Sequence, residues 1–168
     1  MTMLQKTIKY ATDCHQKVNH TYDDKPYTFH LNMVYEVAQK YSYLIPKEDL
    51  ENVYCACWVH DIIEDARETY NDVLKNTNKT IAELAYALTN EKGKTRAARA
   101  NDKYYQGIQE TPNAAFVKLC DRMANITYSK EQGSSMLAKY KNEHEAFIKK
   151  LYQPELQDMI TDIETLLK

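Results

Sequence analysis

The sequence predicts an all-α fold, a single-domain bundle of helices. Glycine and proline, the residues that most often interrupt helices, number only three and four among 168 residues. Alternating β-branched runs, which predict strands, are few, whereas apolar residues recur at helical spacing along most of the chain. The length suits one domain. We predict that this domain spans residues 1–168, with a core over about residues 10–152 and a C-terminal helix over 154–168 that packs on it.

The N-terminal half contains three predicted helices separated by polar segments. The first covers roughly residues 2–18, and the second begins near Tyr27. Pro46 favours the first turn of a third helix, because its missing N–H group needs no partner there. This helix is apolar nearly all round from Val53 to Ile63, so we expect it to be central and buried.

The C-terminal half is predicted to contain shorter and longer helices. Thr69 and Asn78 are residues of the kind that cap helix N-termini, which predicts a short helix after each. A polar and basic segment over residues 87–106 is interrupted by Gly93 and predicts a loop that enters a surface helix. The remaining helices are expected to begin at Pro112 and to cover roughly residues 134–152 and 154–167.

Charge and hydropathy argue against two classes of partner. The formal net charge of −2 provides no basic excess to coat a nucleic-acid polymer. No apolar run approaches the roughly 20 residues that cross a bilayer, and the N-terminus lacks the apolar block of a secretory signal. Cys14, Cys55, Cys57 and Cys120 have no Cys-x-x-Cys spacing, which favours buried free thiols in a reducing compartment. We therefore expect a cytoplasmic protein without membrane or polynucleotide partners, and its oligomeric state stays open.

The most informative segment follows the apolar stretch of the third helix. His60 and Asp61 are adjacent there, and a charged pair in apolar surroundings is costly unless something such as a divalent metal compensates it. Helical spacing would place Glu64 and Asp65 on the same face. The alternative is a helix end that emerges into water, where the acidic residues form a solvated face. The segment alone leaves both interpretations open.

Two side chains on other predicted helices could complete a metal site. His30 faces inward on the second helix, and Asp121 is embedded in the apolar run FVKLCDRMANI. Each has a simpler interpretation, because His30 could be a satisfied core histidine and Arg122 could neutralise Asp121. Two imidazoles and two carboxylates on three inward-facing helices suit a borderline divalent ion such as Mn²⁺, Fe²⁺ or Zn²⁺.

These motifs resemble those of the HD superfamily of metal-dependent phosphohydrolases, and more narrowly the hydrolase domain of RelA/SpoT-type enzymes and its small stand-alone homologues. That family's pattern reads PYxxHP…VA, then LLHDxxEDT, then KLxDRLxNxR. The chain has PYTFHLNMVYEVA, CWVHDIIEDARETYNDV and VKLCDRMANIT in this order. The family removes the 3′-pyrophosphate from ppGpp and pppGpp with Mn²⁺, so the resemblance implies an HD-type helical fold and nucleotide hydrolysis.

The resemblance also implies roles for individual residues. Glu64 and Asp65 match the catalytic pair that positions or deprotonates the attacking water. The implied cofactor is one divalent ion, Mn²⁺ first, with Fe²⁺, Zn²⁺, Co²⁺ and Ni²⁺ as alternatives. The residues that match the metal ligands are His30, His60, Asp61 and Asp121. The residues expected to contact substrate are Asn19, His20, Tyr27, Lys118 and Asn125.

The chain departs from the family pattern mainly in the substrate pocket. Asn19 and His20 stand where the family has an Arg-Lys pair that contacts base and phosphate, and Thr127 replaces a pocket arginine. Arg96 and its basic neighbours could attract phosphates over the pocket or could form a solvated basic helix. A phosphatase for other nucleotides, a nucleotide sensor without turnover and a purely structural helical protein therefore stay open beside a ppGpp hydrolase.

Overall fold

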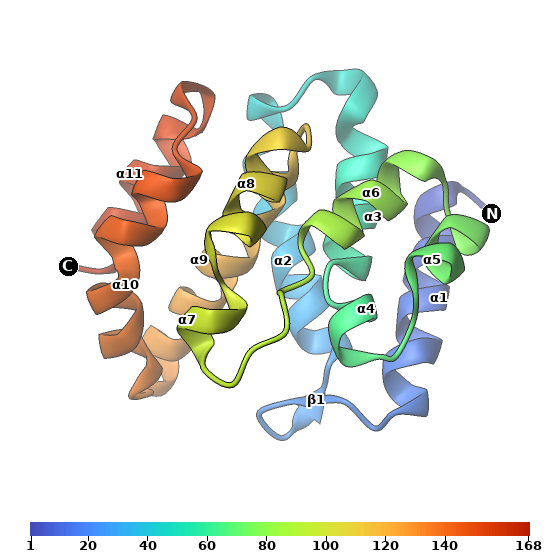
Figure 1. Cartoon of the computed structure of the whole chain (residues 1–168), viewed down its shortest axis with the longest axis horizontal. Coiled ribbons are helices and arrows are strands. Elements are labelled where there is room, and N and C mark those ends of the chain that lie inside the picture. The colour runs from blue at the N-terminus through green and yellow to red at the C-terminus, as the bar shows by residue number, and fades with distance from the viewer.

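The computed structural model describes all 168 residues, and it is helical apart from one short hairpin (Figure 1). The α-helices are α1 (Met3–Lys17), α2 (Thr28–Lys40), α3 (Leu50–Val59), α4 (Ile62–Asp65), α5 (Tyr70–Asn76), α6 (Lys79–Ala87), α7 (Arg96–Arg99), α8 (Asp102–Glu110), α9 (Ala114–Gln132), α10 (Met136–Leu151) and α11 (Gln157–Leu166). Three 3₁₀ turns are η1 (Ser42–Leu44), η2 (Lys47–Asp49) and η3 (Pro154–Leu156). The hairpin pairs β1 (Thr21–Tyr22) with β2 (Lys25–Pro26) in antiparallel register. The all-α prediction is confirmed.

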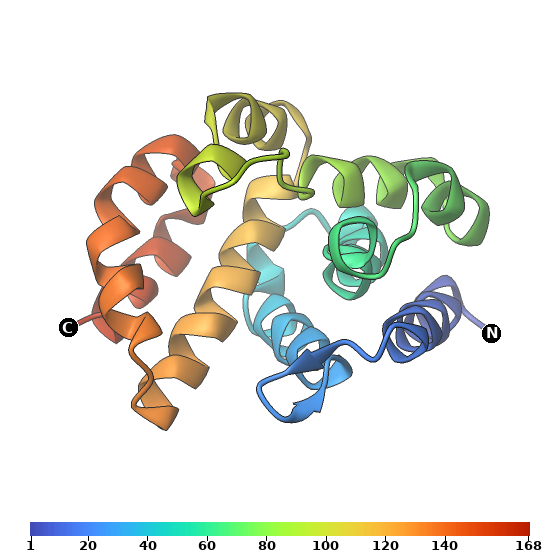
Figure 2. The same ribbon diagram turned by 60° about the horizontal axis from the view of Figure 1, so that its bottom comes forward.

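Three helices, α2, α3 and α9, form the centre of the molecule. Helix α2 packs against both α3 and α9 (Figures 1 and 2). Helices α1 and α6 pack on α3, whereas α10 and α11 pack on α9. Every residue from Cys55 to Val59 is buried, as expected for a central helix that is apolar all round. The centre therefore joins two helices from the first 60 residues with one that begins at residue 114.

Local sequence signals place several helix ends correctly. The Thr69 hydroxyl accepts a hydrogen bond from the backbone amide of Asp72 at the start of α5, and the Asn78 side chain accepts one from Ile81 at the start of α6. Both are side-chain N-caps, which satisfy amides that have no partner within the helix. The two predicted caps are confirmed.

The basic segment after α6 forms a loop, the single turn α7 and then α8. A Cβ atom at Gly93 would lie 2.7 Å from Cβ of Ala98, so this loop needs glycine in order to approach α7 so closely. The next helix begins at Ala114 rather than Pro112, because Asn113 adopts a left-handed conformation with φ 69°. Near the C-terminus, Met159 and Ile163 of α11 are fully buried, and α11 packs against α9.

One sequence prediction is wrong in a way that affects the site. The third helix is not continuous from Pro46 to Ile63, because a 3₁₀ turn precedes it and it ends at Val59. Asp61 has φ −107° and ψ 0°, values outside the helical region, and α4 begins only at Ile62. His60 and Asp61 therefore lie in a turn between two helices rather than on one helical face.

The cysteines were expected to be buried free thiols. All four cysteines are free, and three are buried, but Cys14 is only partly buried, contrary to the expectation.

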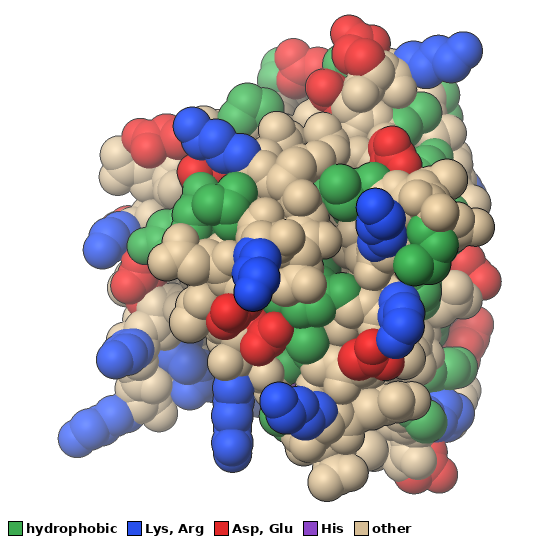
Figure 3. Space-filling view, turned by 90° about the vertical axis from the view of Figure 1, so that its right-hand side faces the viewer, with side chains coloured by type: hydrophobic (Ala, Val, Ile, Leu, Met, Phe, Trp, Pro, Cys, Tyr) green, Lys and Arg blue, Asp and Glu red, His purple; other side chains and the backbone are tan.

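On the face turned toward the viewer in Figure 3, acidic and basic side chains are scattered among exposed hydrophobic ones. No helix combines the length and the apolar character that a membrane span needs.

Candidate metal centre

The predicted metal-binding groups come from three packed elements. His30 lies in the first turn of α2, His60 directly follows α3, and Asp121 lies near the middle of α9. Nε2 of His30 is 2.9 Å from Oδ1 of Asp121, and Nε2 of His60 is 3.4 Å from the same oxygen. All three donor groups lie within 4.8 Å of one another, and all three residues are buried. The structure thus brings together side chains 91 positions apart.

Asp61 adjoins this cluster through His60. Its Oδ2 atom lies 3.0 Å from Nε2 of His60. The Asp61 carboxylate also forms a second group with Glu64 and Asp65, in which the ligand atoms lie within 4.8 Å of one another. The turn at Asp61 therefore links a buried cluster of two imidazoles and a carboxylate to an exposed pair of carboxylates on α4.

The tautomer of His60 follows from its backbone contact. Nδ1 of His60 lies 2.7 Å from the carbonyl oxygen of Cys57, which can only accept, so Nδ1 carries the proton. Nε2 is buried and has no hydrogen-bond partner, although carboxylate oxygens of Asp61 and Asp121 lie 3.0 and 3.4 Å away. A buried polar atom without a partner usually indicates a missing ligand or ion. A histidine whose other nitrogen is held by a carbonyl is typical of metal ligands.

The donor set fits a divalent cation. Atoms that bind one ion at about 2.1 Å and at right angles to each other lie about 3 Å apart. The separations around His60 and Asp121 are 2.9, 3.0 and 3.4 Å. Imidazole nitrogens combined with carboxylate oxygens suit Mn²⁺, Fe²⁺ and Zn²⁺.

Burial and neighbouring charges act in opposite directions on the pKa values of His60 and Asp121. Burial opposes protonation of His60, but the carboxylates of Asp61 and Asp121 together hold its pKa well above the usual value. Burial likewise opposes ionisation of Asp121, but His60 and Lys118 hold the pKa of that carboxyl well below its usual range. The surroundings therefore keep Asp121 ionised and favour positive charge beside it.

The carboxyl groups of Glu64 and Asp65 have raised pKa values, in contrast to that of Asp121. Both residues are exposed on one side, yet partial burial of the carboxyl groups, with the charge of Asp61, raises the pKa of Glu64 to about 7 and that of Asp65 to about 6. A carboxylate with a near-neutral pKa is suited to accept a proton at physiological pH.

Three of the five residues expected to contact substrate lie against the metal-binding groups, and their contact with substrate stays a prediction. The Tyr27 hydroxyl donates a hydrogen bond to the Asp61 carboxylate. Nδ2 of Asn125 donates to Oδ1 of Asp121 at 3.1 Å. Nζ of Lys118 lies 3.5 Å from Oδ2 of Asp121. These side chains orient the carboxylates from outside the cluster.

The other two expected substrate contacts lie further out. The His20 ring stacks on Tyr27 with centroids 3.8 Å apart, and its Nδ1 lies 2.9 Å from Nδ1 of His15. Asn19 is exposed just after α1 with φ 52°, and its side chain forms no hydrogen bond. His15 was missed as a neighbour of the site. No local sequence pattern predicted that an aromatic side chain of the β1–β2 hairpin would stack on a residue of the site.

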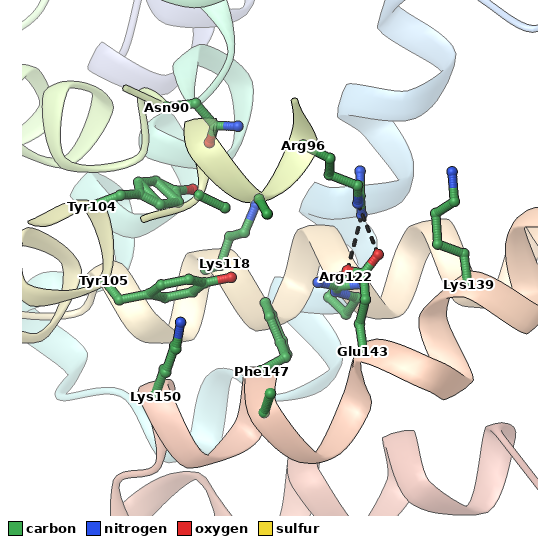
Figure 4. Close-up of a pocket in the computed structure, with 13 residues that line it drawn as sticks. Asn90, Arg96, Tyr104, Tyr105, Lys118, Arg122, Lys139, Glu143, Phe147 and Lys150 are labelled. Carbon is green, nitrogen blue, oxygen red and sulfur yellow. Dashed lines mark hydrogen bonds and ion pairs between the residues drawn. The ribbon is translucent and has the colours of Figure 1, made fainter. Parts of the chain in front are cut away.

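A basic cavity of about 510 Å³ lies between α7, α8, α9 and α10 (Figure 4). Of the basic segment, Arg96 lines this cavity, whereas Lys92, Lys94 and Arg99 do not. Five cations, three aromatic rings and one carboxylate dominate its wall: Arg96, Lys118, Arg122, Lys139, Lys150, Tyr104, Tyr105, Phe147 and Glu143. The metal-binding groups do not line it, but Lys118 contacts Asp121 and so connects the cavity with the cluster.

Arg122 does not neutralise Asp121, which excludes the simpler interpretation of that aspartate. Its guanidinium lies 3.8 Å from the centroid of the Phe147 ring and 3.4 Å from the Glu143 carboxylate. Nε of Arg96 reaches the same carboxylate at 2.8 Å (Figure 4). The charge of Asp121 is therefore balanced by His60 and Lys118, with a hydrogen bond to His30, rather than by the adjacent arginine.

Comparison with known proteins agrees with this geometry. The HD domain family profile matches residues 28–126, which contain all four predicted metal ligands. Guanosine-3′,5′-bis(diphosphate) 3′-pyrophosphohydrolase MESH1 of Danio rerio is 25% identical over 124 residues, which is 74% of this chain and 67% of that protein. A solved structure, reported as a metazoan ortholog of SpoT that hydrolyzes ppGpp, has the same fold: its TM-score is 0.75 at 19% identity, over 97% of this chain and 94% of that one. The chain belongs to the HD domain family of metal-dependent phosphohydrolases.

Proposed function

We propose that this chain hydrolyses the 3′-pyrophosphate ester of guanosine 3′,5′-bis(diphosphate) or a closely related nucleotide, with Mn²⁺ as cofactor. The observation that carries the proposal is the convergence of His30, His60 and Asp121 within 4.8 Å, next to the carboxylate group of Asp61, Glu64 and Asp65. The similarity to a 3′-pyrophosphohydrolase supports the choice of substrate.

The metal would be held by His30, His60, Asp61 and Asp121. When bound, a divalent ion in such a site lowers the pKa of a bound water and polarises a phosphoryl oxygen. Tyr27 and Asn125 would keep the two carboxylates oriented through the hydrogen bonds described above.

Glu64 and Asp65 would serve the attacking water. The water oxygen forms a bond to the phosphorus while the bond from phosphorus to the 3′-oxygen breaks. Glu64, with Asp65 as its neighbour, accepts the water proton and returns it to the leaving 3′-oxygen, so that pyrophosphate and a 3′-hydroxyl result. The raised pKa of Glu64, about 7, suits both steps near neutral pH.

The basic cavity would bind the phosphates that do not react. It has five cationic side chains and one carboxylate, and that carboxylate is already paired with Arg96 and Arg122. Lys139 has no ion-pair partner and can attract anionic oxygens, while Lys118 and Lys150, which are paired with Asp121 and Asp102, add two further cations to the wall. A nucleotide with two separate phosphate groups would then place one group at the cluster and the other in the cavity, which are connected by Lys118.

A second candidate is a phosphatase for other nucleoside phosphates. It is favoured by one observation: His20, at a position where the family has a cation for base and phosphate, is stacked on Tyr27 instead. Its pKa is lowered by burial, so this imidazole adds no positive charge near neutral pH. Such an enzyme would release orthophosphate from a mono- or triphosphate.

The test is a product analysis with metal-stripped protein that is reloaded with Mn²⁺. Guanosine 3′,5′-bis(diphosphate), GTP, GDP and several nucleoside monophosphates are supplied, and released pyrophosphate and orthophosphate are measured separately. Pyrophosphate from the bis(diphosphate) alone supports the main proposal, and orthophosphate from the other nucleotides supports the second candidate. An Asp61→Ala variant that hydrolyses as fast as the parent would overturn both.

A further inference from the structure

The β1–β2 hairpin reaches the metal centre through one side chain. Tyr22, in β1, stacks on the His30 imidazole with ring centroids 4.6 Å apart and planes inclined by 15°. Its hydroxyl lies 2.7 Å from Oδ1 of Asn125, which is 103 positions away in the sequence. The same residue therefore contacts one predicted metal ligand and the amide that supports another.

Two hydrogen bonds connect Tyr22 to Asp121 through the side-chain amide of Asn125. Nδ2 of Asn125 donates to Oδ1 of Asp121 at 3.1 Å, and an amide oxygen can only accept. Oδ1 of Asn125 then faces Tyr22, whose hydroxyl must donate. The hydroxyl thus fixes the orientation of the Asn125 amide, and the amide in turn fixes Oδ1 of Asp121.

We propose that Tyr22 is a positioning residue of the metal centre. Its ring face holds the His30 imidazole, and its hydroxyl holds Asp121 through Asn125. The inference rests on the proposed metal site and adds a support that lies outside the helices that carry the ligands. It also assigns Asn125 to the support of Asp121, because both ends of its amide already have protein partners.

The hairpin offers a matched control for general loosening. The Tyr128 hydroxyl donates to Oδ2 of Asp23 at 2.7 Å, which ties the same hairpin to the same helix, α9. Tyr128 forms no hydrogen bond with a predicted ligand or with Asn125. Loss of this hydroxyl would weaken the attachment of the hairpin without removing either contact of Tyr22.

The experiment measures the dissociation constant of Mn²⁺ by calorimetry on metal-stripped protein without substrate. Tyr22→Phe keeps the ring and loses the hydroxyl, and Tyr22→Leu loses both contacts. Loss of outer hydrogen bonds around a metal ligand usually weakens metal binding by about 10- to 100-fold. We expect about tenfold weaker binding for Tyr22→Phe, a larger loss for Tyr22→Leu, and a change below about twofold for Tyr128→Phe.

The outcomes separate this inference from the proposed function. Wild-type Mn²⁺ affinity in Tyr22→Leu, with loss of binding in Asp121→Ala, would overturn the role of Tyr22 and leave the metal site intact. An equal loss in Tyr128→Phe and Tyr22→Phe would also overturn it, because hairpin attachment alone would then explain the effect. Unchanged Mn²⁺ binding in Asp121→Ala would instead refute the metal site. Circular dichroism of each variant verifies that it is folded.

Discussion

Nζ of Lys118 lies 3.5 Å from Oδ2 of Asp121, one turn further along the same helix, and Lys118 also lines the basic cavity. Its ammonium group lies 5.7 Å from the centroid of Tyr104, so the cation is held between a carboxylate and an aromatic face. The contact places the metal-binding groups and the cavity on two sides of a single lysine. Substitutions near the metal-binding groups should therefore affect the chemical step, whereas substitutions in the cavity should affect substrate binding.

Glu64→Gln should lower kcat and leave Mn²⁺ affinity nearly unchanged. The substitution removes a proton acceptor but retains the shape of the side chain, and general base catalysis contributes about 10²- to 10⁴-fold to a rate. We expect kcat to fall by at least about 10²-fold in steady-state assays of pyrophosphate release. Glu68→Gln is the control, because Glu68 contacts Tyr10 and Cys14 instead of the cluster. Comparable losses in the two variants would argue against Glu64 as the base.

Arg96→Ala should raise KM more than it lowers kcat. Both arginines of α7 carry the same charge, but Arg96 lines the cavity and pairs with Glu143, whereas Arg99 contacts the backbone oxygen of Gly93. Removal of Arg96 deletes a cation and leaves Glu143 less neutralised, so KM should rise about tenfold, which corresponds to about 1.4 kcal/mol. Arg99→Ala should change KM by less than about twofold. An equal rise in both variants would show that only the net charge of the surface matters.

His15 should make the metal-free protein less stable in acid. Burial, together with the charge of His20, lowers the pKa of His15 from 6.5 to about 4, although Asp61 opposes the shift. As the pH falls from 6.5 to 4, the unfolded chain takes up a proton that the folded protein excludes, and the free energy of unfolding decreases by up to about 3 kcal/mol.

The measurement is urea unfolding between pH 7 and 4.5 in the presence of a chelator, for the parent and for His15→Gln. The variant lacks this titration, so its stability should decline less steeply as the pH falls. Other acid-sensitive groups are common to both proteins and cancel in the comparison. Curves of equal slope would contradict the prediction.

Met159→Ala should destabilise the whole chain, because we propose that residues 1–168 form one domain. Met159 is fully buried where α11 packs on α9, and truncation of such a side chain costs about 2–5 kcal/mol. Thr161→Ala, at an exposed position of α11, should change the free energy of unfolding by less than about 0.5 kcal/mol. Circular dichroism and Trp58 fluorescence should report one transition with the same midpoint. A separate early transition for α11 would disprove a single cooperative unit.

The features that were predictable from sequence depend on neighbours in the chain. The caps at Thr69 and Asn78 form hydrogen bonds only three residues away, so residue type and spacing were sufficient to find them. The grouping of Asp61 with Glu64 and Asp65 was also local, although it arises in a turn rather than on one continuous helix.

The features that were missed depend on distant contacts. Helical periodicity continues through His60, so only tertiary packing can end α3 there. The hairpin has strands of two residues, and its contacts with α9 span more than 100 positions. The same limit applies to Arg122, whose partner Glu143 belongs to α10. Pattern and resemblance together indicated His30 and Asp121, and they indicated Lys118 and Asn125 as substrate contacts rather than as neighbours of Asp121. Tyr22, which stacks on His30, was not indicated.

Asp121 and Arg122 are successive residues of α9, and their side chains leave the helix axis about 100° apart. One therefore meets the imidazoles of the centre, while the other packs on Phe147 beside the cavity. An insertion or deletion of one residue between Ala114 and Lys118 would rotate the preceding part of the chain by about 100° around the axis of α9, relative to Asp121 and Arg122. Homologous chains should therefore show no insertion or deletion between Ala114 and Asp121.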